Sequence, residues 1–171
     1  MRYYYFDASV LVKAYLWETG PDDVRQVLRD TRAAPPRAHV ATSSLAFVEV
    51  ASAVSRRDRA GEISHEEANG IRDRLRNDFE SALVPYSLVK PRQVVLGRAA
   101  ALTRAHRLRA LDALHLATGI GFRSETPAEA SFHFASADRR LSIAALSESF
   151  DVFDPQSPVP PGTGSPVAPA E

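Results

Sequence analysis

The stretch Tyr3-Tyr-Tyr-Phe-Asp-Ala-Ser-Val-Leu-Val12 sets the class of fold that we expect for this chain. Its first four residues are aromatic and compact, which favours a buried β-strand. The segment that follows, Val10–Trp17, is typical of a helix, and Asp7 stands between the two elements. A strand that passes directly into a helix is the repeating unit of α/β proteins.

The same alternation of strand-like and helical segments continues outward from this stretch to about residue 154. Further strands are predicted at His39–Thr42, Leu83–Tyr86, Phe132–Ala135 and Phe150–Phe153. Helices are predicted at Pro21–Thr31, from Ser43 or Ser44 to about Arg59, from the capping box Ser64-x-x-Glu67 through Phe79, from Pro91 through Leu102, at Asp112–Ile120 and at Asp138–Leu146. This order predicts an α/β fold with a mostly parallel central sheet.

The length of 171 residues suits one domain, and 44% hydrophobic with 25% charged residues is the composition of an ordinary globular protein. Six of the 12 prolines lie at or beyond Pro155, mixed with Gly162, Gly164 and Ser165. Such a segment sustains neither helix nor sheet. We therefore expect a folded domain over residues 1–154 and a flexible tail over residues 155–171.

The composition also excludes several classes of protein. The chain has no cysteine, which rules out disulfides, cysteine-ligated zinc and thiol catalysis, and is compatible with a reducing cytosol. No window approaches the ~20 apolar residues of a membrane helix, and the N-terminus has no signal-peptide pattern, so we expect a cytoplasmic protein. The 21 basic residues balance the 21 acidic ones. All basic residues except Lys13 and Lys90 are arginines, which suits phosphate binding but also follows from codon bias.

Four acidic residues stand in apolar surroundings, unlike most of the 21: Asp7, Glu49, Asp112 and Asp138. An isolated carboxylate costs several kcal/mol to bury unless it is paired, protonated or bound to metal. Asp7 and Asp138 follow predicted strands, and the other two stand early in predicted helices. Because the carboxyl ends of parallel strands form the functional edge of such sheets, the four carboxylates are expected to converge there. A hard divalent cation such as Mg²⁺ or Mn²⁺ would relieve their mutual repulsion.

Each acid also has a structural alternative. Asp7 and Asp138 could cap the helices that follow them, and Asp138 could instead pair with Arg139 or Arg140. Glu49 could pair with a distant arginine, and Asp112 could simply favour the positive end of its helix.

The five histidines show no ligand spacing. His115 lies one turn after Asp112 and could reach the same edge, but we expect it to be a packed, hydrogen-bonded core residue.

These segments, in this order, resemble the PIN domain family and, within it, the VapC-like toxins of type II toxin–antitoxin systems. The resemblance rests on Tyr5-Phe-Asp-Ala-Ser-Val-Leu-Val12, Ser44-Leu-Ala-Phe-Val-Glu-Val-Ala51, Leu108-Arg-Ala-Leu-Asp-Ala-Leu-His-Leu-Ala117 and Phe134-Ala-Ser-Ala-Asp-Arg-Arg-Leu141. It implies a three-layer α/β/α fold, with metal-binding acids at Asp7, Glu49, Asp112 and Asp138 and supporting hydroxyls at Ser9 and Ser136. The chain departs from the family at Ala110, where relatives often have Ser or Thr, so a helix cap is expected to be missing there.

The resemblance further implies an endoribonuclease that uses Mg²⁺ or Mn²⁺ to hydrolyse RNA phosphodiester bonds through a metal-activated water. It also implies a homodimer that is neutralised by a small cognate antitoxin. Two alternatives keep the scaffold: a housekeeping RNA-processing nuclease, and a non-catalytic protein that binds RNA or a partner. A haloacid-dehalogenase-type phosphatase is disfavoured, because it needs a second aspartate where this chain has Ser9.

Overall fold

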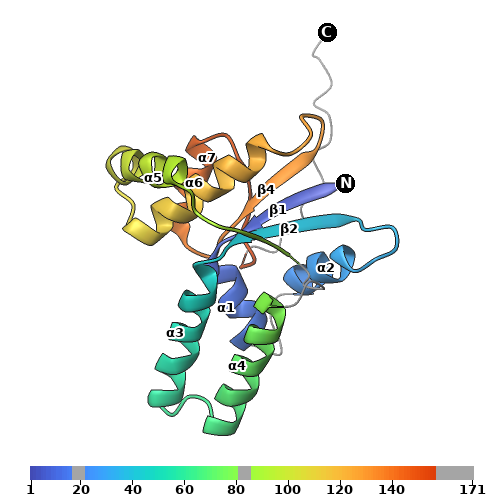
Figure 1. Cartoon of the computed structure of the whole chain (residues 1–171), viewed down its shortest axis with the longest axis vertical. Coiled ribbons are helices and arrows are strands. Elements are labelled where there is room, and N and C mark those ends of the chain that lie inside the picture. Colours follow the sequence, from blue (N-terminus) through green and yellow to red (C-terminus); the bar gives the residue numbers. More distant parts are fainter. Residues whose placement is uncertain (17–21, 81–85, 157–171) are drawn as a thin grey trace.

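The computed structural model describes residues 1–16, 22–80 and 86–156. In this part of the chain, five strands form one sheet in the order β3-β2-β1-β4-β5, and every pairing is parallel (Figure 1). The strands are β1 Arg2–Phe6, β2 Ala38–Ser43, β3 Ser87–Val89, β4 Ser131–Ala135 and β5 Asp151–Phe153. In the register of the sheet, Phe6 of β1 lies opposite Thr42 of β2 and Ala135 of β4. The carboxyl ends of these three central strands therefore lie side by side.

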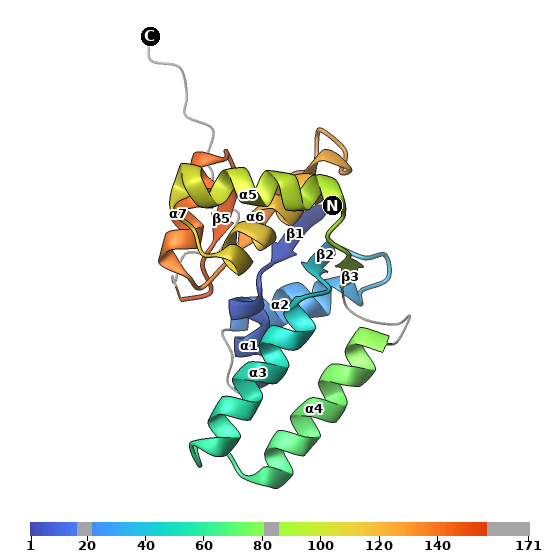
Figure 2. The same ribbon diagram turned by 60° about the vertical axis from the view of Figure 1, so that its left-hand side comes forward.

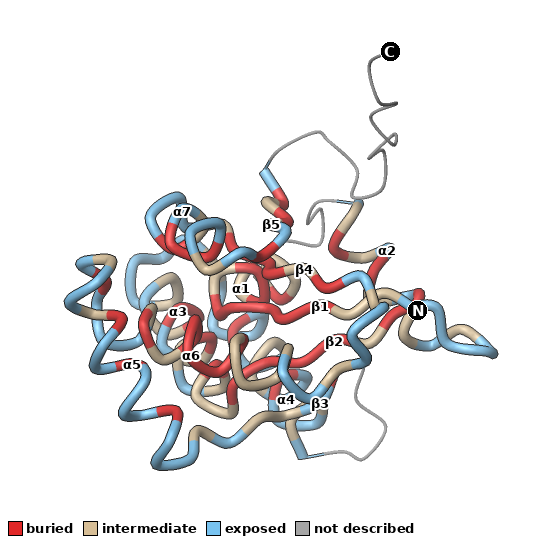
Figure 3. The backbone as a smooth tube through the Cα atoms, turned by 90° about the horizontal axis from the view of Figure 1, so that it is seen from above, coloured by how far each residue is buried: buried red, intermediate tan, exposed pale blue. Residues whose placement is uncertain are grey.

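Helices cover both faces of the sheet and make three layers. The helices are α1 Ala8–Leu16, α2 Asp22–Thr31, α3 Ala46–Arg59, α4 His65–Glu80, α5 Gln93–His106, α6 Ala110–Ser124 and α7 Arg139–Ser147. Helices α1–α4 gather on one side of the sheet and α5–α7 on the other (Figure 1). Buried residues follow β1, β2 and β4 through the middle of the molecule (Figure 3). The predicted α/β/α architecture is confirmed.

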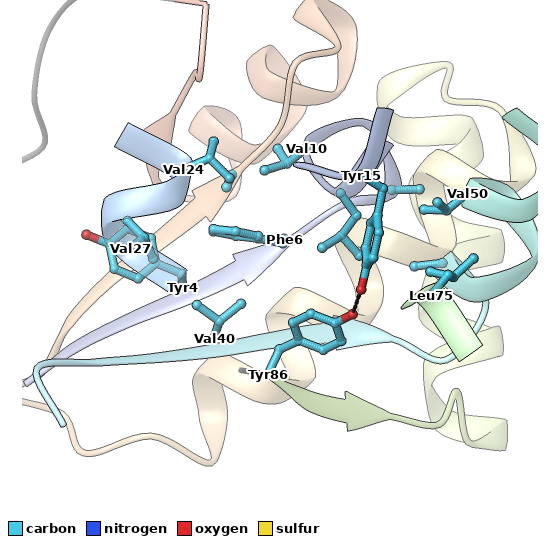
Figure 4. Packing of buried hydrophobic residues seen from close by; sticks show 14 of the residues in the cluster. Tyr4, Phe6, Val10, Tyr15, Val24, Val27, Val40, Val50, Leu75 and Tyr86 are labelled. Atoms are coloured by element: carbon cyan, nitrogen blue, oxygen red, sulfur yellow. Dashed lines mark hydrogen bonds between the residues drawn. The ribbon is translucent and has the colours of Figure 1, made fainter. Parts of the chain in front are cut away.

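The first strand divides the core into two parts. Tyr4 and Phe6 point to one side and pack with Val10 of α1, Val24 of α2 and Val40 of β2 (Figure 4). Tyr5 points to the opposite side, because successive side chains of a strand alternate between the faces, and it packs there with residues of α5–α7. Burial of each such side chain stabilises the fold by about 1.5–3 kcal/mol. A strand covered on both faces reads as a continuous apolar run, which explains the aromatic start of the sequence.

Helices α3 and α4 lie side by side and extend away from the sheet (Figure 2). The capping box predicted at the start of α4 is confirmed. The Ser64 backbone N–H donates to Glu67 Oε2 at 2.8 Å, and the Glu67 N–H donates to Ser64 Oγ at 3.2 Å. The C-terminal end of α4 is bound to α1, because the Tyr15 hydroxyl of α1 donates to Asp78 Oδ2 of α4 at 2.7 Å. The Tyr15 hydroxyl is also hydrogen-bonded to the Tyr86 hydroxyl (Figure 4).

The structure corrects the prediction for the third strand. This strand runs over Ser87–Val89, beyond the predicted Leu83–Tyr86, of which only Tyr86 falls within the described residues. Tyr86 is instead buried against α1 and α4. A short apolar run does not by itself determine register, which depends on the neighbouring strand.

The start of α3 also differs from the prediction. The helix begins at Ala46 with Leu45 as its N-cap residue, so neither serine caps it. Ser43 ends β2 instead, and its Oγ accepts a hydrogen bond from the Leu45 N–H at 3.2 Å.

The helix predicted over Val10–Trp17 begins earlier, at Ala8, and Trp17 lies outside the described residues, as does Pro21, the expected start of α2. Most of the predicted tail, residues 157–171, also lies outside them. None of the helices seen between residues 1 and 156 has the length and apolar character needed to cross a bilayer.

Candidate active site

The four predicted acids all lie near the carboxyl edge of the sheet. Asp7 directly follows β1, and Asp138 is the N-cap residue of α7, which follows β4. Glu49 stands in the first turn of α3, which follows β2, and Asp112 in the first turn of α6. Because β2, β1 and β4 are neighbours, their following segments meet at one edge.

Asp7 is almost fully buried, with only 4% of its surface exposed. Its Oδ1 accepts hydrogen bonds from Ser9 Oγ at 2.6 Å and from the Val10 N–H at 3.0 Å, so it does cap α1. Burial raises the pKa of the Asp7 carboxyl, while the nearby His115 imidazole and these hydrogen bonds act in the opposite direction. The cap and the acidic site therefore share one side chain.

The two predicted hydroxyls connect Asp7 to the segment that follows β4. Ser136 is fully buried; its Oγ donates to Asp7 Oδ2 at 2.7 Å and accepts from the Asp138 N–H at 3.0 Å. Ser9 Oγ accepts from the Ala137 N–H at 2.8 Å while donating to Asp7. These bonds hold the backbone of Asp138 at a set position relative to the Asp7 carboxylate.

Glu49 contacts a histidine rather than an arginine. Its Oε2 lies 2.6 Å from Nε2 of His115, and Nδ1 of the same ring lies 2.9 Å from the Tyr5 hydroxyl. His115 is 3% exposed, so the prediction of a packed, hydrogen-bonded histidine is confirmed. The alternative prediction gave Glu49 an arginine partner, whereas the observed partner is His115.

Asp112 and Asp138 are electrostatic neighbours. Partial burial raises the pKa of the Asp112 carboxyl, and the negative charge of Asp138 raises it further. Arg109 and His115 lower it. Asp138 Oδ1 accepts from the Leu141 N–H at 3.0 Å, so Asp138 also caps its helix. Helix α6 has no such side-chain cap, but its N-cap residue is Arg109, whereas Ala110, where the missing cap was expected, is its first helical residue.

The donor chemistry of the site fits a hard divalent cation. All four predicted ligands are carboxylates. Among the described residues, the hydrogen bonds to the side chains of Asp7, Glu49 and Asp138 come from hydroxyls, backbone N–H groups and one imidazole, and none comes from an arginine side chain. Oxygen ligands, and the repulsion between the Asp112 and Asp138 carboxylates, suit Mg²⁺ or Mn²⁺. Over residues 1–16, 22–80 and 86–156, however, no three acidic or histidine side chains form a preassembled metal cluster. Serine and histidine contacts link the acids instead.

The sequence prediction did not anticipate the contacts that Tyr5 and His115 make at this site. Tyr5 is expected only in the strand core, and His115 is expected in the core, although its position one turn after Asp112 would also let it reach this edge. One signal was present, because the spacing Asp112-x-x-His115 places both side chains on the same side of a helix. The partner residue Glu49 is 66 positions away in the chain, and no local pattern indicates that contact.

The fold is also found in solved structures of other proteins. A structure described as FitAcB from Neisseria gonorrhoeae has a TM-score of 0.57 at 18% identity, covering 89% of this chain and 97% of the other. A toxin–antitoxin complex from Klebsiella pneumoniae has a TM-score of 0.55 at 15% identity, covering 88% and 96%. VapBC2 from Rickettsia felis, bound to a DNA fragment from its promoter, has a TM-score of 0.57 at 12% identity, covering 89% and 98%. At these identities the likeness concerns the fold alone.

Among curated proteins, none matches the chain. The family model described as PIN domain matches residues 4–146, which include all four acids. This match spans most of the 171 residues. The chain belongs to the PIN domain family.

Proposed function

We propose that this protein is a metal-dependent endoribonuclease, and specifically the toxin of a toxin–antitoxin pair. The observation that carries the proposal is the set of four carboxylates at the carboxyl edge of the parallel sheet; in the described part of the chain, the hydrogen bonds to Asp7, Glu49 and Asp138 come from groups other than arginine side chains. Family membership supports nuclease chemistry. Gathering like charges at one edge destabilises the fold unless a cation binds among them.

The residues proposed to hold Mg²⁺ or Mn²⁺ are Asp7, Glu49, Asp112 and Asp138. Asp7 and Asp112 are the proposed direct ligands, and Glu49 and Asp138 would act directly or through bound water. When bound, the cation would polarise the scissile phosphate and lower the pKa of a water molecule enough to supply hydroxide near neutral pH. The 2′-hydroxyl of RNA has no role as nucleophile in this proposal, so the products would carry 5′-phosphates.

The chain's own side chains would keep the acids ready for this chemistry. Ser9 and Ser136 occupy both carboxylate oxygens of Asp7, which holds the buried group in one orientation. Burial and, to a smaller extent, the negative charge of Asp138 raise the pKa of Asp112, and a bound cation would favour its charged form. Preorganised groups of this kind reduce the reorganisation needed when substrate arrives.

The similar solved structures support the proposed biological setting. Two of them are described as toxin–antitoxin or VapBC complexes, and one of these was bound to DNA from its own promoter. By analogy we propose a small cognate antitoxin, a homodimer, an RNA substrate and a cytoplasmic location. The domain over residues 1–154 would carry these functions, and residues 155–171 would form an appended tail.

An RNA cleavage assay tests the proposal. Purified, antitoxin-free protein is incubated with RNA in Mg²⁺, Mn²⁺ or EDTA, beside the Asp7→Asn variant and the control Asp73→Asn, an exposed acid of α4. We expect 5′-phosphate products that EDTA and Asp7→Asn abolish and Asp73→Asn preserves. Wild-type cleavage no greater than that of Asp7→Asn would contradict the proposal and favour a binding protein. Growth arrest on expression, relieved by Asp7→Asn, would distinguish a toxin from a housekeeping nuclease.

A further inference from the structure

We infer that His115, itself held by Tyr5, is a positioning residue that fixes the Glu49 carboxylate at the acidic edge of the sheet for cation binding. This inference rests on the proposed function and adds two residues to it. Neither side chain would touch the cation or RNA. Both would act through Glu49.

The three side chains form a continuous chain of hydrogen bonds from the core to the acidic edge. The Tyr5 hydroxyl lies 2.9 Å from His115 Nδ1, and His115 Nε2 lies 2.6 Å from Glu49 Oε2. Tyr5 is fully buried, His115 nearly so, and the Glu49 side chain is 23% exposed. The chain therefore begins at a rigid position and ends at the edge where the other acids lie.

The direction of the hydrogen bonds follows from the chemistry of the groups. A carboxylate only accepts, so Nε2 of His115 carries the proton in its bond to Glu49, whether the ring is neutral or charged. A tyrosine hydroxyl keeps its proton at neutral pH, so the Tyr5 hydroxyl can donate to Nδ1 of the neutral ring. Both ring nitrogens are thus engaged, and the imidazole is held at two points.

Packing around the ring adds to this restraint. Tyr5 stacks on Phe134 with ring centroids 5.3 Å apart, and its ring meets that of His115 edge-on at 6.0 Å. Helix α6, which carries His115, also carries Asp112 one turn earlier. His115 therefore lies on the same helix as one proposed ligand, Asp112, and is hydrogen-bonded to a second, Glu49.

A flexible glutamate needs such a partner more than the aspartates do. Asp7 and Asp138 accept hydrogen bonds from the backbone of their own helices, whereas the bond to Glu49 comes from a residue 66 positions away. The bond to His115 uses Oε2 and leaves Oε1 for a cation. Partners of this kind typically change metal affinity or activity by about 10–100-fold when they are removed.

Mn²⁺ affinity, measured by titration with detection of free Mn²⁺ by electron paramagnetic resonance, tests the inference without RNA. His115→Met keeps a side chain of similar length but cannot donate, whereas His115→Gln keeps an N–H near the position of Nε2. We expect His115→Met to weaken Mn²⁺ binding by about 10–100-fold, and His115→Gln to restore most of that loss. Tyr5→Phe, which removes one hydroxyl, provides a milder variant should His115→Met not fold, and it should weaken binding in the same direction.

A double-mutant cycle distinguishes positioning from general damage to the core. If His115 acts through Glu49, then His115→Met will add little to the loss already caused by Glu49→Gln. An undiminished loss in that background, or wild-type affinity in His115→Met, would overturn the inference. Should the wild type itself bind no Mn²⁺, the proposed function fails and the inference fails with it. If the wild type binds Mn²⁺ and the His115 variants bind it with the same affinity, the inference is rejected while the proposed function stands.

Discussion

Asp7 and Asp138 each cap the helix that follows them, and each also lies at the acidic edge of the sheet. In both residues the cap uses Oδ1, so capping does not occupy the whole carboxylate. For Asp7, the second oxygen accepts one hydrogen bond, from Ser136, and keeps a second lone pair for a cation. At the scale of single residues, the structural and functional interpretations of these aspartates are therefore compatible.

The buried Asp7 carboxyl predicts a specific dependence of stability on pH. Because its pKa is raised in the folded state, the folded protein loses stability relative to the unfolded chain as the pH rises from about 4 through the folded pKa. Asp7→Asn removes this penalty. In EDTA we therefore expect the stability of the variant relative to the wild type to increase as the pH rises from 4 to 7.

Urea unfolding followed by circular dichroism at pH 4, 5.5 and 7 checks this expectation. The difference in unfolding free energy between the two proteins should grow with pH and be smallest at pH 4. A difference that stays constant over this range would show that the Asp7 carboxyl carries no such penalty.

Among the helices, α6 carries three residues that shape the candidate site, although no single sequence pattern indicated all three. Asp112 stands in its first turn, His115 follows one turn later, and Gly119 one further turn on. A Cβ added at Gly119 would lie 2.9 Å from Cε2 of Phe134 and 3.3 Å from Cδ1 of Tyr5. The glycine thus allows α6 to approach β1 and β4 closely enough for His115 to reach Tyr5.

We therefore expect Gly119→Ala to destabilise the protein by about 1–3 kcal/mol, because the Phe134 and Tyr5 rings are packed and must move. Gly121→Ala on the same helix is the matched control, since its Cβ would meet no atom within 4 Å. That substitution should stabilise the helix by about 0.5–1 kcal/mol. Urea denaturation measures both changes, and equal stability of the two variants would contradict the close approach.

Helix α4 offers a second test at this scale. Ser64→Ala removes the hydroxyl that accepts from the Glu67 N–H, and should cost about 0.5–2 kcal/mol. Glu67→Gln is the control, because glutamine can still accept from the Ser64 N–H in a capping box. Thermal unfolding compares the two variants, and an equal effect of both would show that the serine hydroxyl is not the stabilising group.

At the scale of the whole molecule, β5 contributes the last buried hydrophobic residue of the described core. Phe153 of β5 is buried, and Ser136 beside Asp7 donates its N–H to the Phe153 carbonyl at 3.1 Å. Beyond it, Gln156 Nε2 donates to the Ala137 carbonyl at 3.1 Å. The edge strand thus supports the segment that holds Ser136 and Asp138.

A chain that ends at Gln156 should accordingly unfold at the same temperature as the full chain, because the proline-rich remainder has little apolar surface to bury. A chain that ends at Phe150 lacks β5 and should fail to fold cooperatively. Calorimetry of both proteins tests the proposed domain boundary. A marked loss of stability in the chain ending at Gln156 would show that the boundary is placed too early.

The sequence by itself determined the features that depend on neighbouring residues. The alternation of strands and helices, the capping box at Ser64 and the placement of acids after strands all follow from local hydrogen bonding and side-chain periodicity. Parallel strands then bring their carboxyl ends to one edge, which is why four scattered acids could be predicted to converge.

Only the tertiary structure decided that His115 holds Glu49 and is itself held by Tyr5. His115 is 110 residues from Tyr5 and 66 from Glu49. Ser136 was expected from the family resemblance, but its bond to Asp7, 129 residues away, also depends on the packed fold. The start of β3 at Ser87 likewise depends on pairing with β2. Such contacts depend on how helices pack on both faces of a sheet, and sequence periodicity specifies which face a residue occupies but not which distant side chain it meets.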